Sequence, residues 1–154
     1  LAFLTSCFWP AQKNYNFEFS NCDDYEFLLD FLHSSFERPN NISDIKEFYP
    51  LYISKDAQKT MVEEINSLNF DLSKIYKNDK SSIALTDQFC GEVGEKDGLH
   101  NPDYFNKVIL LKFRIKQHNK FIYVKFIQKY PKMYCELKEF EITDEDRALE
   151  APKE

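Results

Sequence analysis

The chain has 154 residues, of which 43% are hydrophobic and 16% are aromatic, and it contains only 3 glycines and 6 prolines. This length suits one ordinary domain with a single core, and the composition excludes a disordered or low-complexity chain. The 20 basic residues against 26 acidic residues leave a formal charge of −6, which excludes a general attraction to nucleic acid or to anionic lipid.

The first seven residues end on a cysteine that follows an apolar run. The run Leu-Ala-Phe-Leu leads into Thr5, Ser6 and Cys7, and this pattern resembles the lipobox of bacterial lipoproteins. In that class of protein the cysteine thiol carries the lipid, and small residues before it allow the signal peptidase to bind the chain. The resemblance implies a lipid on Cys7, with residues 1–21 as a remnant of the signal segment and a tether. It also implies a location in the bacterial cell envelope, periplasmic or at the cell surface, with membrane contact only through the lipid anchor.

A second interpretation of the same opening residues needs no lipid. Residues 1–8 would then form an ordinary apolar strand or a buried arm, in which Cys7 is a small core residue. No other part of the sequence contains an apolar run of the roughly 20 residues that span a bilayer as a helix.

Two helices are predicted before residue 50. In the first, over residues 23–38, Asp23 and Glu26 have the spacing of a capping box, and apolar residues then recur at helical spacing. A short second helix is predicted from Ser43 to Phe48, where the next proline ends it.

A third helix is predicted after Ser54, which is a good N-cap residue. Its apolar residues recur at steps of four, four and three along one face: Ala57, Met61, Ile65 and Leu68. Residues 69–82 are rich in turn-forming residues and are predicted to form a loop, and a short strand is predicted over residues 83–89. All three glycines lie in the segment 91–98, which we expect to be the most flexible part of the chain.

The last third of the chain alternates apolar and polar residues, as strands do. Strands are predicted over residues 108–116, 121–128 and 133–142, with a turn at 117–120, and together they form an antiparallel meander whose apolar face covers the helices. Lysines alternate with the apolar residues of these strands. They are interpreted as the solvated face of the sheet, with an anion-binding surface as the alternative.

The elements together predict one α+β domain over residues 22–143, with N-terminal helices packed on a curved antiparallel sheet in a cone-like roll. The tail over residues 144–154 is polar and acidic, and we expect it to fray.

This order of elements resembles the nuclear transport factor 2-like (cystatin-like) cone fold, and in particular the bacterial lipoproteins that carry it. The resemblance covers residues 23–142 and rests on the stretches 48–54 and 85–91 and on the last two strands. It implies a cavity between the sheet and the helices. Enzymes of this fold, such as ketosteroid isomerases, use one carboxylate as a proton shuttle and a tyrosine as an oxyanion donor in that cavity. By elimination, the candidate cavity residues in this chain are Asp87, Tyr49, Tyr52, Tyr123 and Tyr134.

Three cysteines remain besides the one near the start, namely Cys22, Cys90 and Cys135. The favoured interpretation is that they are small buried residues. The alternative, in the oxidising compartment that export implies, is one disulfide, either Cys22–Cys135 or Cys22–Cys90. No pair of cysteines, or of cysteine and histidine, has the spacing of a metal site, so no metal is expected. The sequence also contains no nucleotide-binding or hydrolase motif, and no cofactor is expected.

Two functions remain open. The favoured one is a non-catalytic binding or envelope-associated module that holds a small ligand or a protein partner, without nucleic acid. The alternative is a small isomerase- or lyase-like enzyme. They differ at Asp87, because an enzyme needs this carboxylate buried beside a tyrosine with a shifted pKa, whereas a binding module does not.

Overall fold

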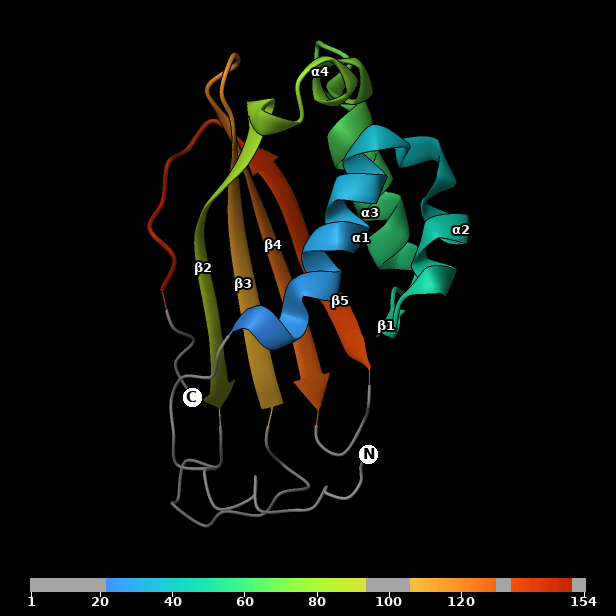
Figure 1. The fold of residues 1–154 in the computed structure, drawn as a ribbon, viewed down its shortest axis with the longest axis vertical. Helices are drawn as coiled ribbons and strands as arrows, with labels where there is room; N and C mark the ends of the chain where they lie inside the picture. Colours follow the sequence, from blue (N-terminus) through green and yellow to red (C-terminus); the bar gives the residue numbers. More distant parts are fainter. Residues whose placement is uncertain (1–21, 94–105, 130–133, 151–154) are drawn as a thin grey trace.

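The computed structural model of the chain describes residues 22–93, 106–129 and 134–150 (Figure 1). The described helices lie in the N-terminal half and pack on one face of a five-stranded sheet that does not close into a barrel. The predicted α+β class, with N-terminal helices on a sheet, is therefore confirmed.

The first helical segments differ from the prediction mainly at their starts. Helix α1 (Glu26–Glu37) follows a 3-10 turn over Cys22–Tyr25, and its N-cap residue makes no side-chain hydrogen bond, so the predicted capping box is absent. Helix α2 (Ile42–Ile45) continues as a 3-10 turn over Lys46–Phe48. Its N-cap is Asn41 rather than the predicted Ser43.

The next two helices show which local signals can be read from sequence. Helix α3 (Lys55–Asn66) begins where predicted, because the Ser54 hydroxyl accepts a hydrogen bond from the Ala57 amide at 3.0 Å. Helix α4 (Leu72–Asn78) lies in the segment that was predicted to be a loop, and that prediction is wrong. The Asp71 side chain caps α4.

The sheet has the spatial order β1-β5-β4-β3-β2. Its strands are β1 (Leu51–Tyr52), β2 (Ile83–Val93), β3 (Asn106–Ile115), β4 (Lys120–Lys129) and β5 (Cys135–Thr143). The predicted meander is confirmed as β3, β4 and β5, and β2 extends it as a fourth antiparallel strand. The short β1 was not predicted, and it pairs with β5 in parallel. The hairpin turn between β3 and β4 contains Asn119, whose positive φ of 51° is a conformation that asparagine tolerates.

The core lies between the helices and the sheet. Alternate residues of β3 point into it, as predicted: Ile109, Leu111, Phe113 and Ile115. A disulfide between Cys22 and Cys90, with a Cα–Cα distance of 5.4 Å, attaches the start of the helical layer to β2. Cys135 is buried and free, so the pairing Cys22–Cys135 is wrong and its alternative is the one present. Cys135 lies at the start of β5, opposite β1, where it is out of reach of Cys22.

Candidate functional site

The space between the helices and the sheet, where the family resemblance implies a cavity, is filled by side chains in the described part of the chain. Four phenylalanines there have no exposed surface: Phe31, Phe36, Phe113 and Phe126. The rings of Phe36 and Phe113 meet edge to face with their centroids 5.4 Å apart, which is a favourable aromatic geometry. The helix-covered face of the sheet is therefore a packed core, and candidate sites must be sought on the outside.

The five candidate cavity residues do not converge on one point. Tyr49 packs against Phe31 at the margin of the core, with ring centroids 6.0 Å apart. The other four lie on the surface or toward it: Tyr52 on β1, Asp87 on β2, Tyr123 on β4 and Tyr134 just before β5. No carboxylate–tyrosine pair of the kind used by the isomerases is formed among them.

Two of these candidates share the outer face of the sheet, which is the face turned away from the helices. The strand register aligns Asp87, Lys112, Tyr123 and Glu141 in one row across four strands. Asp87 is exposed and is followed in the row by Lys112, so its nearest neighbour in the row is a cation and not a tyrosine hydroxyl.

Lys112 is the cation of this row, and it is largely enclosed. Its side chain is only 12% exposed, and its ammonium nitrogen lies 5.4 Å from the centre of the Phe121 ring and 5.8 Å from that of Tyr123. These two rings favour a cation at this point of the outer face. A hydrogen bond to Asp146 raises the pKa of the Lys112 ammonium, so the charge is retained.

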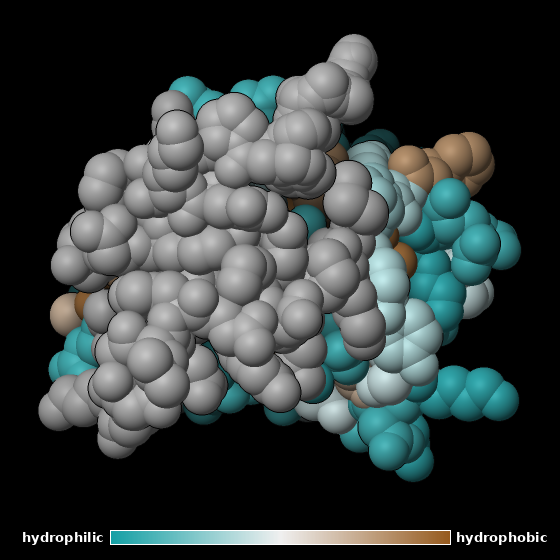
Figure 2. Space-filling model, turned by 90° about the horizontal axis from the view of Figure 1, so that it is seen from below, coloured by the Kyte–Doolittle hydropathy of each residue, from teal (hydrophilic) through white to brown (hydrophobic). Residues whose placement is uncertain are grey.

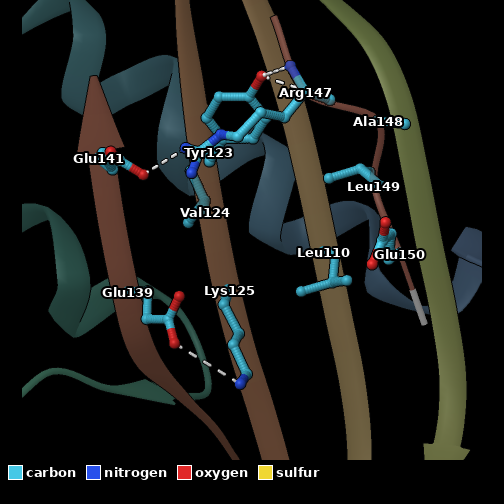
Figure 3. Close-up of a pocket in the computed structure, with 10 residues that line it drawn as sticks. All are labelled: Leu110, Tyr123, Val124, Lys125, Glu139, Glu141, Arg147, Ala148, Leu149 and Glu150. Carbon is cyan, nitrogen blue, oxygen red and sulfur yellow. Dashed lines mark hydrogen bonds and ion pairs between the residues drawn. The ribbon is translucent and has the colours of Figure 1, made fainter. Parts of the chain in front are cut away.

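Residues 144–150, called the strap below, cross this outer face after β5 ends (Figure 3). The strap has no regular secondary structure. It was expected to fray, but it makes specific contacts with the sheet. The Tyr123 hydroxyl accepts a hydrogen bond from the Arg147 amide at 2.6 Å and donates one to the Glu145 carbonyl at 2.9 Å. Lys112 donates to the Arg147 carbonyl at 2.7 Å and to the Asp146 carboxylate at 2.5 Å.

Two further ion pairs attach the strap to the sheet. Lys120 donates to the Asp144 carboxylate at 2.5 Å. The guanidinium of Arg147 lies 4.4 Å from the centre of the Tyr123 ring and donates to Glu141 at 2.5 Å, an arrangement that Figure 3 shows clearly. The hydrogen bond to Glu141 is the main cause of a raised pKa of Arg147.

Below these contacts the strap and the sheet border an open hollow of about 570 Å³. Its lining mixes apolar residues with charged ones: Leu110, Tyr123, Val124, Lys125, Glu139, Glu141, Arg147, Ala148, Leu149 and Glu150 (Figure 3). Lys125 and Glu139 pair across it at 3.6 Å. The hollow is open, so it lacks the enclosure that excludes water from a reacting centre.

A second surface feature lies at the edge of the sheet formed by β1. Three large hydrophobic side chains are exposed there, Phe48 at 82%, Tyr52 at 51% and Tyr134 at 36%. The rings of Tyr52 and Tyr134 lie 6.3 Å apart, and Phe48 is in the turn that leads into β1. We call these three residues the aromatic corner. Figure 2 shows brown and pale surface among hydrophilic atoms on the flank where β1 lies in Figure 1.

Sequence reasoning missed several of these residues. Lys112 binds Asp146 of the strap, and Arg147 binds Glu141 of β5. No local pattern in the sequence reveals either pair. The alternation of lysines along the strands was the one available signal, and it placed Lys112 on the outer face of the sheet.

Among the described residues no group of three or more histidines, cysteines or carboxylates is placed to hold a metal ion. None of the described helices is long and apolar enough to cross a membrane. No protein-family model, curated protein or solved structure matches the chain.

Proposed function

We propose that the chain is a non-catalytic binding module of an exported bacterial lipoprotein, and that it holds a protein partner through the aromatic corner. The observation that carries the proposal is the exposure of Phe48, Tyr52 and Tyr134, which are the large hydrophobic side chains left exposed among the described residues. All three lie near β1, and a cluster of exposed aromatic residues is typical of a protein interface.

The energetics of the corner favour a protein over a small ligand. Phe48 is 82% exposed, so its ring projects from the surface and does not line an enclosed site. Burying such a ring against a partner contributes about 1.5–3 kcal/mol, and aromatic residues of this kind are common interface hot spots.

Export is supported by the Cys22–Cys90 disulfide, because disulfides persist in the periplasm and outside the cell and are rare in the bacterial cytoplasm. The proposed lipid on Cys7 and the tether over residues 1–21 lie outside the described residues. The cone-fold resemblance is retained as part of the proposal, since helices followed by an antiparallel meander are its main feature.

The enzyme alternative has no observation in its favour. It required Asp87 to be buried beside a tyrosine, and Asp87 is exposed on β2 with Lys112 as its neighbour in the cross-strand row. An Asp87→Asn variant is therefore expected to keep the binding activity of the unmodified protein.

The partner interface is tested by placing a photo-crosslinking amino acid at Phe48 or at Tyr52 in the complete protein, expressed in its own host. Lys59, an exposed residue of α3, is the matched control position. We expect one discrete crosslinked protein from positions 48 and 52 and none from position 59. Once that protein is identified, Phe48→Ser should weaken its binding without changing the unfolding midpoint, since exposed side chains contribute little to stability. Equal crosslinking at position 59, or none at the corner, would contradict the proposal.

The lipid anchor has a separate test. Metabolic labelling with a radioactive fatty acid should label the complete protein in the membrane fraction, and the Cys7→Ser variant should lose both the label and the membrane association. An unlabelled wild-type protein in the soluble fraction would contradict the anchor and leave the aromatic corner unaffected.

A further inference from the structure

The strap and the outer face of the sheet form a complete peptide-recognition site inside one molecule. The main-chain groups of a single strap residue, Arg147, are both bound: its amide donates to the Tyr123 hydroxyl at 2.6 Å, and its carbonyl accepts from Lys112 at 2.7 Å. Side chains that bind the amide and the carbonyl of one residue fix an extended chain whatever its sequence.

Specificity comes from three charged contacts at fixed steps along the strap. Lys120 binds the carboxylate of Asp144, and Lys112 binds that of Asp146. The next residue, Arg147, places its guanidinium on the Tyr123 ring and on Glu141. The contacts of the outer face thus match a segment with the pattern acidic, any residue, acidic, arginine.

The sheet side of these contacts is more enclosed than the strap side. Lys112 and Lys120 are 12% and 26% exposed, whereas their partners Asp146 and Asp144 are 66% and 80% exposed. The ammonium group of Lys112 lies over the rings of Phe121 and Tyr123. Ion pairs to such exposed carboxylates contribute little to stability, so these two pairs by themselves hold the strap only weakly.

We propose that the outer face of the sheet, centred on Lys112, Lys120 and Tyr123, binds an acidic extended segment of a partner protein in place of the strap. The strap is its intramolecular competitor. Charge complementarity argues for this occupant, because the cations on the face meet carboxylates spaced two residues apart. This surface is separate from the aromatic corner, and either can be lost without the other.

The test uses a fluorescent peptide with the strap sequence, Thr-Asp-Glu-Asp-Arg-Ala-Leu-Glu, and measures its binding by fluorescence anisotropy. A complete chain with Asp144→Asn, Asp146→Asn and Arg147→Ala has a weakened strap and an unchanged sheet face. We expect it to bind the peptide at least about tenfold more tightly than the wild type does, because the strap no longer competes. A scrambled peptide of the same composition is the control.

A variant of the outer face distinguishes specific binding at this site from nonspecific electrostatic attraction. Lys112→Met keeps an unbranched side chain of similar length and removes the ammonium group. In the weakened-strap chain it should lower peptide affinity by about tenfold, as the loss of a charge-assisted hydrogen bond does. Lys59→Met on α3 removes the same charge elsewhere and should leave binding unchanged. No binding to the weakened-strap chain, or equal binding of the scrambled peptide, would overturn the proposal.

A measurement on the wild type keeps the test valid if the weakened-strap chain does not fold. Excess unlabelled peptide added to isotopically labelled protein should shift the amide resonances of Tyr123 and Arg147 as the strap is displaced, while the Ser54 amide stays in place. Unchanged resonances at saturating peptide would overturn the proposal. A wild-type dimer that the peptide dissociates would also overturn it, because the occupant would then be the strap of a second copy.

Discussion

The side-chain carboxylate of Glu64 on α3 accepts a hydrogen bond from the backbone amide of Ile142 on β5, at 2.7 Å. Strand β1 pairs with β5 only at Cys135 and Glu136, so the remainder of this sheet edge depends on α3 for cover. An uncovered strand edge offers its amides to other chains. Glu64 satisfies one such amide and fixes the helix on the edge.

Removal of this carboxylate should destabilise the fold. Glu64→Ala leaves the partly buried amide of Ile142 without its acceptor, and we expect a loss of about 1–2 kcal/mol in the free energy of unfolding. Glu64→Gln keeps an acceptor oxygen and should lose less. Chemical denaturation measures both, with Glu63→Ala, at an exposed neighbouring position, as the control. Faster hydrogen exchange at Ile142 is expected only in Glu64→Ala, and equal exchange in both alanine variants would contradict the contact.

The Cys22–Cys90 disulfide closes a loop with a sequence separation of 68 residues. The cross-link reduces the entropy of the unfolded chain. Replacing both cysteines with serine should therefore lower the free energy of unfolding by about 4 kcal/mol. Thermal unfolding of the oxidised protein and of the Cys22→Ser/Cys90→Ser variant checks this. Identical midpoints would mean that the bridge is not formed in solution.

Cys135 should be chemically silent in the folded protein. The residue is 1% exposed, and burial raises the pKa of its thiol to about 11, so the reactive thiolate is scarce at about pH 8. In a Cys7→Ser background, we expect iodoacetamide to label Cys135 only after denaturation, as read by peptide mass spectrometry. Rapid labelling of the native protein would show that the start of β5 opens.

His33 predicts a pH dependence of stability. Its ring stacks on Tyr76 at 5.7 Å and meets Phe36 and Phe113 edge-on, and burial lowers its pKa from the ordinary value of 6.5. The nearby Asp30 opposes this shift and Lys80 adds to it.

Because the folded state disfavours protonated His33, the unfolded chain takes up more protons below pH 6.5. Stability is therefore complete above that pH and falls as the pH is lowered through it. His33→Phe should flatten this part of the unfolding profile between about pH 5 and pH 7, where an unperturbed histidine titrates. An identical slope in the wild type and in His33→Phe would contradict the assignment.

The parts of the fold that were predicted from sequence are those encoded by local signals. Ser54 and the apolar periodicity after it specify α3, and strand alternation specifies β3 and β4 with the correct faces inward. Helix α4 was missed because its seven residues provide only two buried positions, Leu72 and Tyr76, within a segment of turn-forming residues. It is helical because α1 covers it, which is a tertiary cause.

The candidate site was harder to predict because proximity across the sheet leaves no trace in one sequence. The choice between Cys90 and Cys135 as the partner of Cys22 depends on strand order, which alternation does not specify. The candidate tyrosines were chosen by residue type for a cavity, and the aromatic core fills that space. Arg147 lay in a tail without periodicity, and only its contacts with Tyr123 and Glu141 reveal a role.

The pairing of β1 with β5 also determines when the aromatic corner is completed during folding. Leu51 and Cys135 are neighbours in the sheet but far apart in the chain, whereas β3, β4 and β5 follow one another and form their contacts over short loops. Contacts that close long loops form late, because the entropy of closure must be overcome first. We therefore expect Tyr52 to meet Tyr134 only after the meander is complete, so that a partner bound at the corner selects fully folded molecules over intermediates.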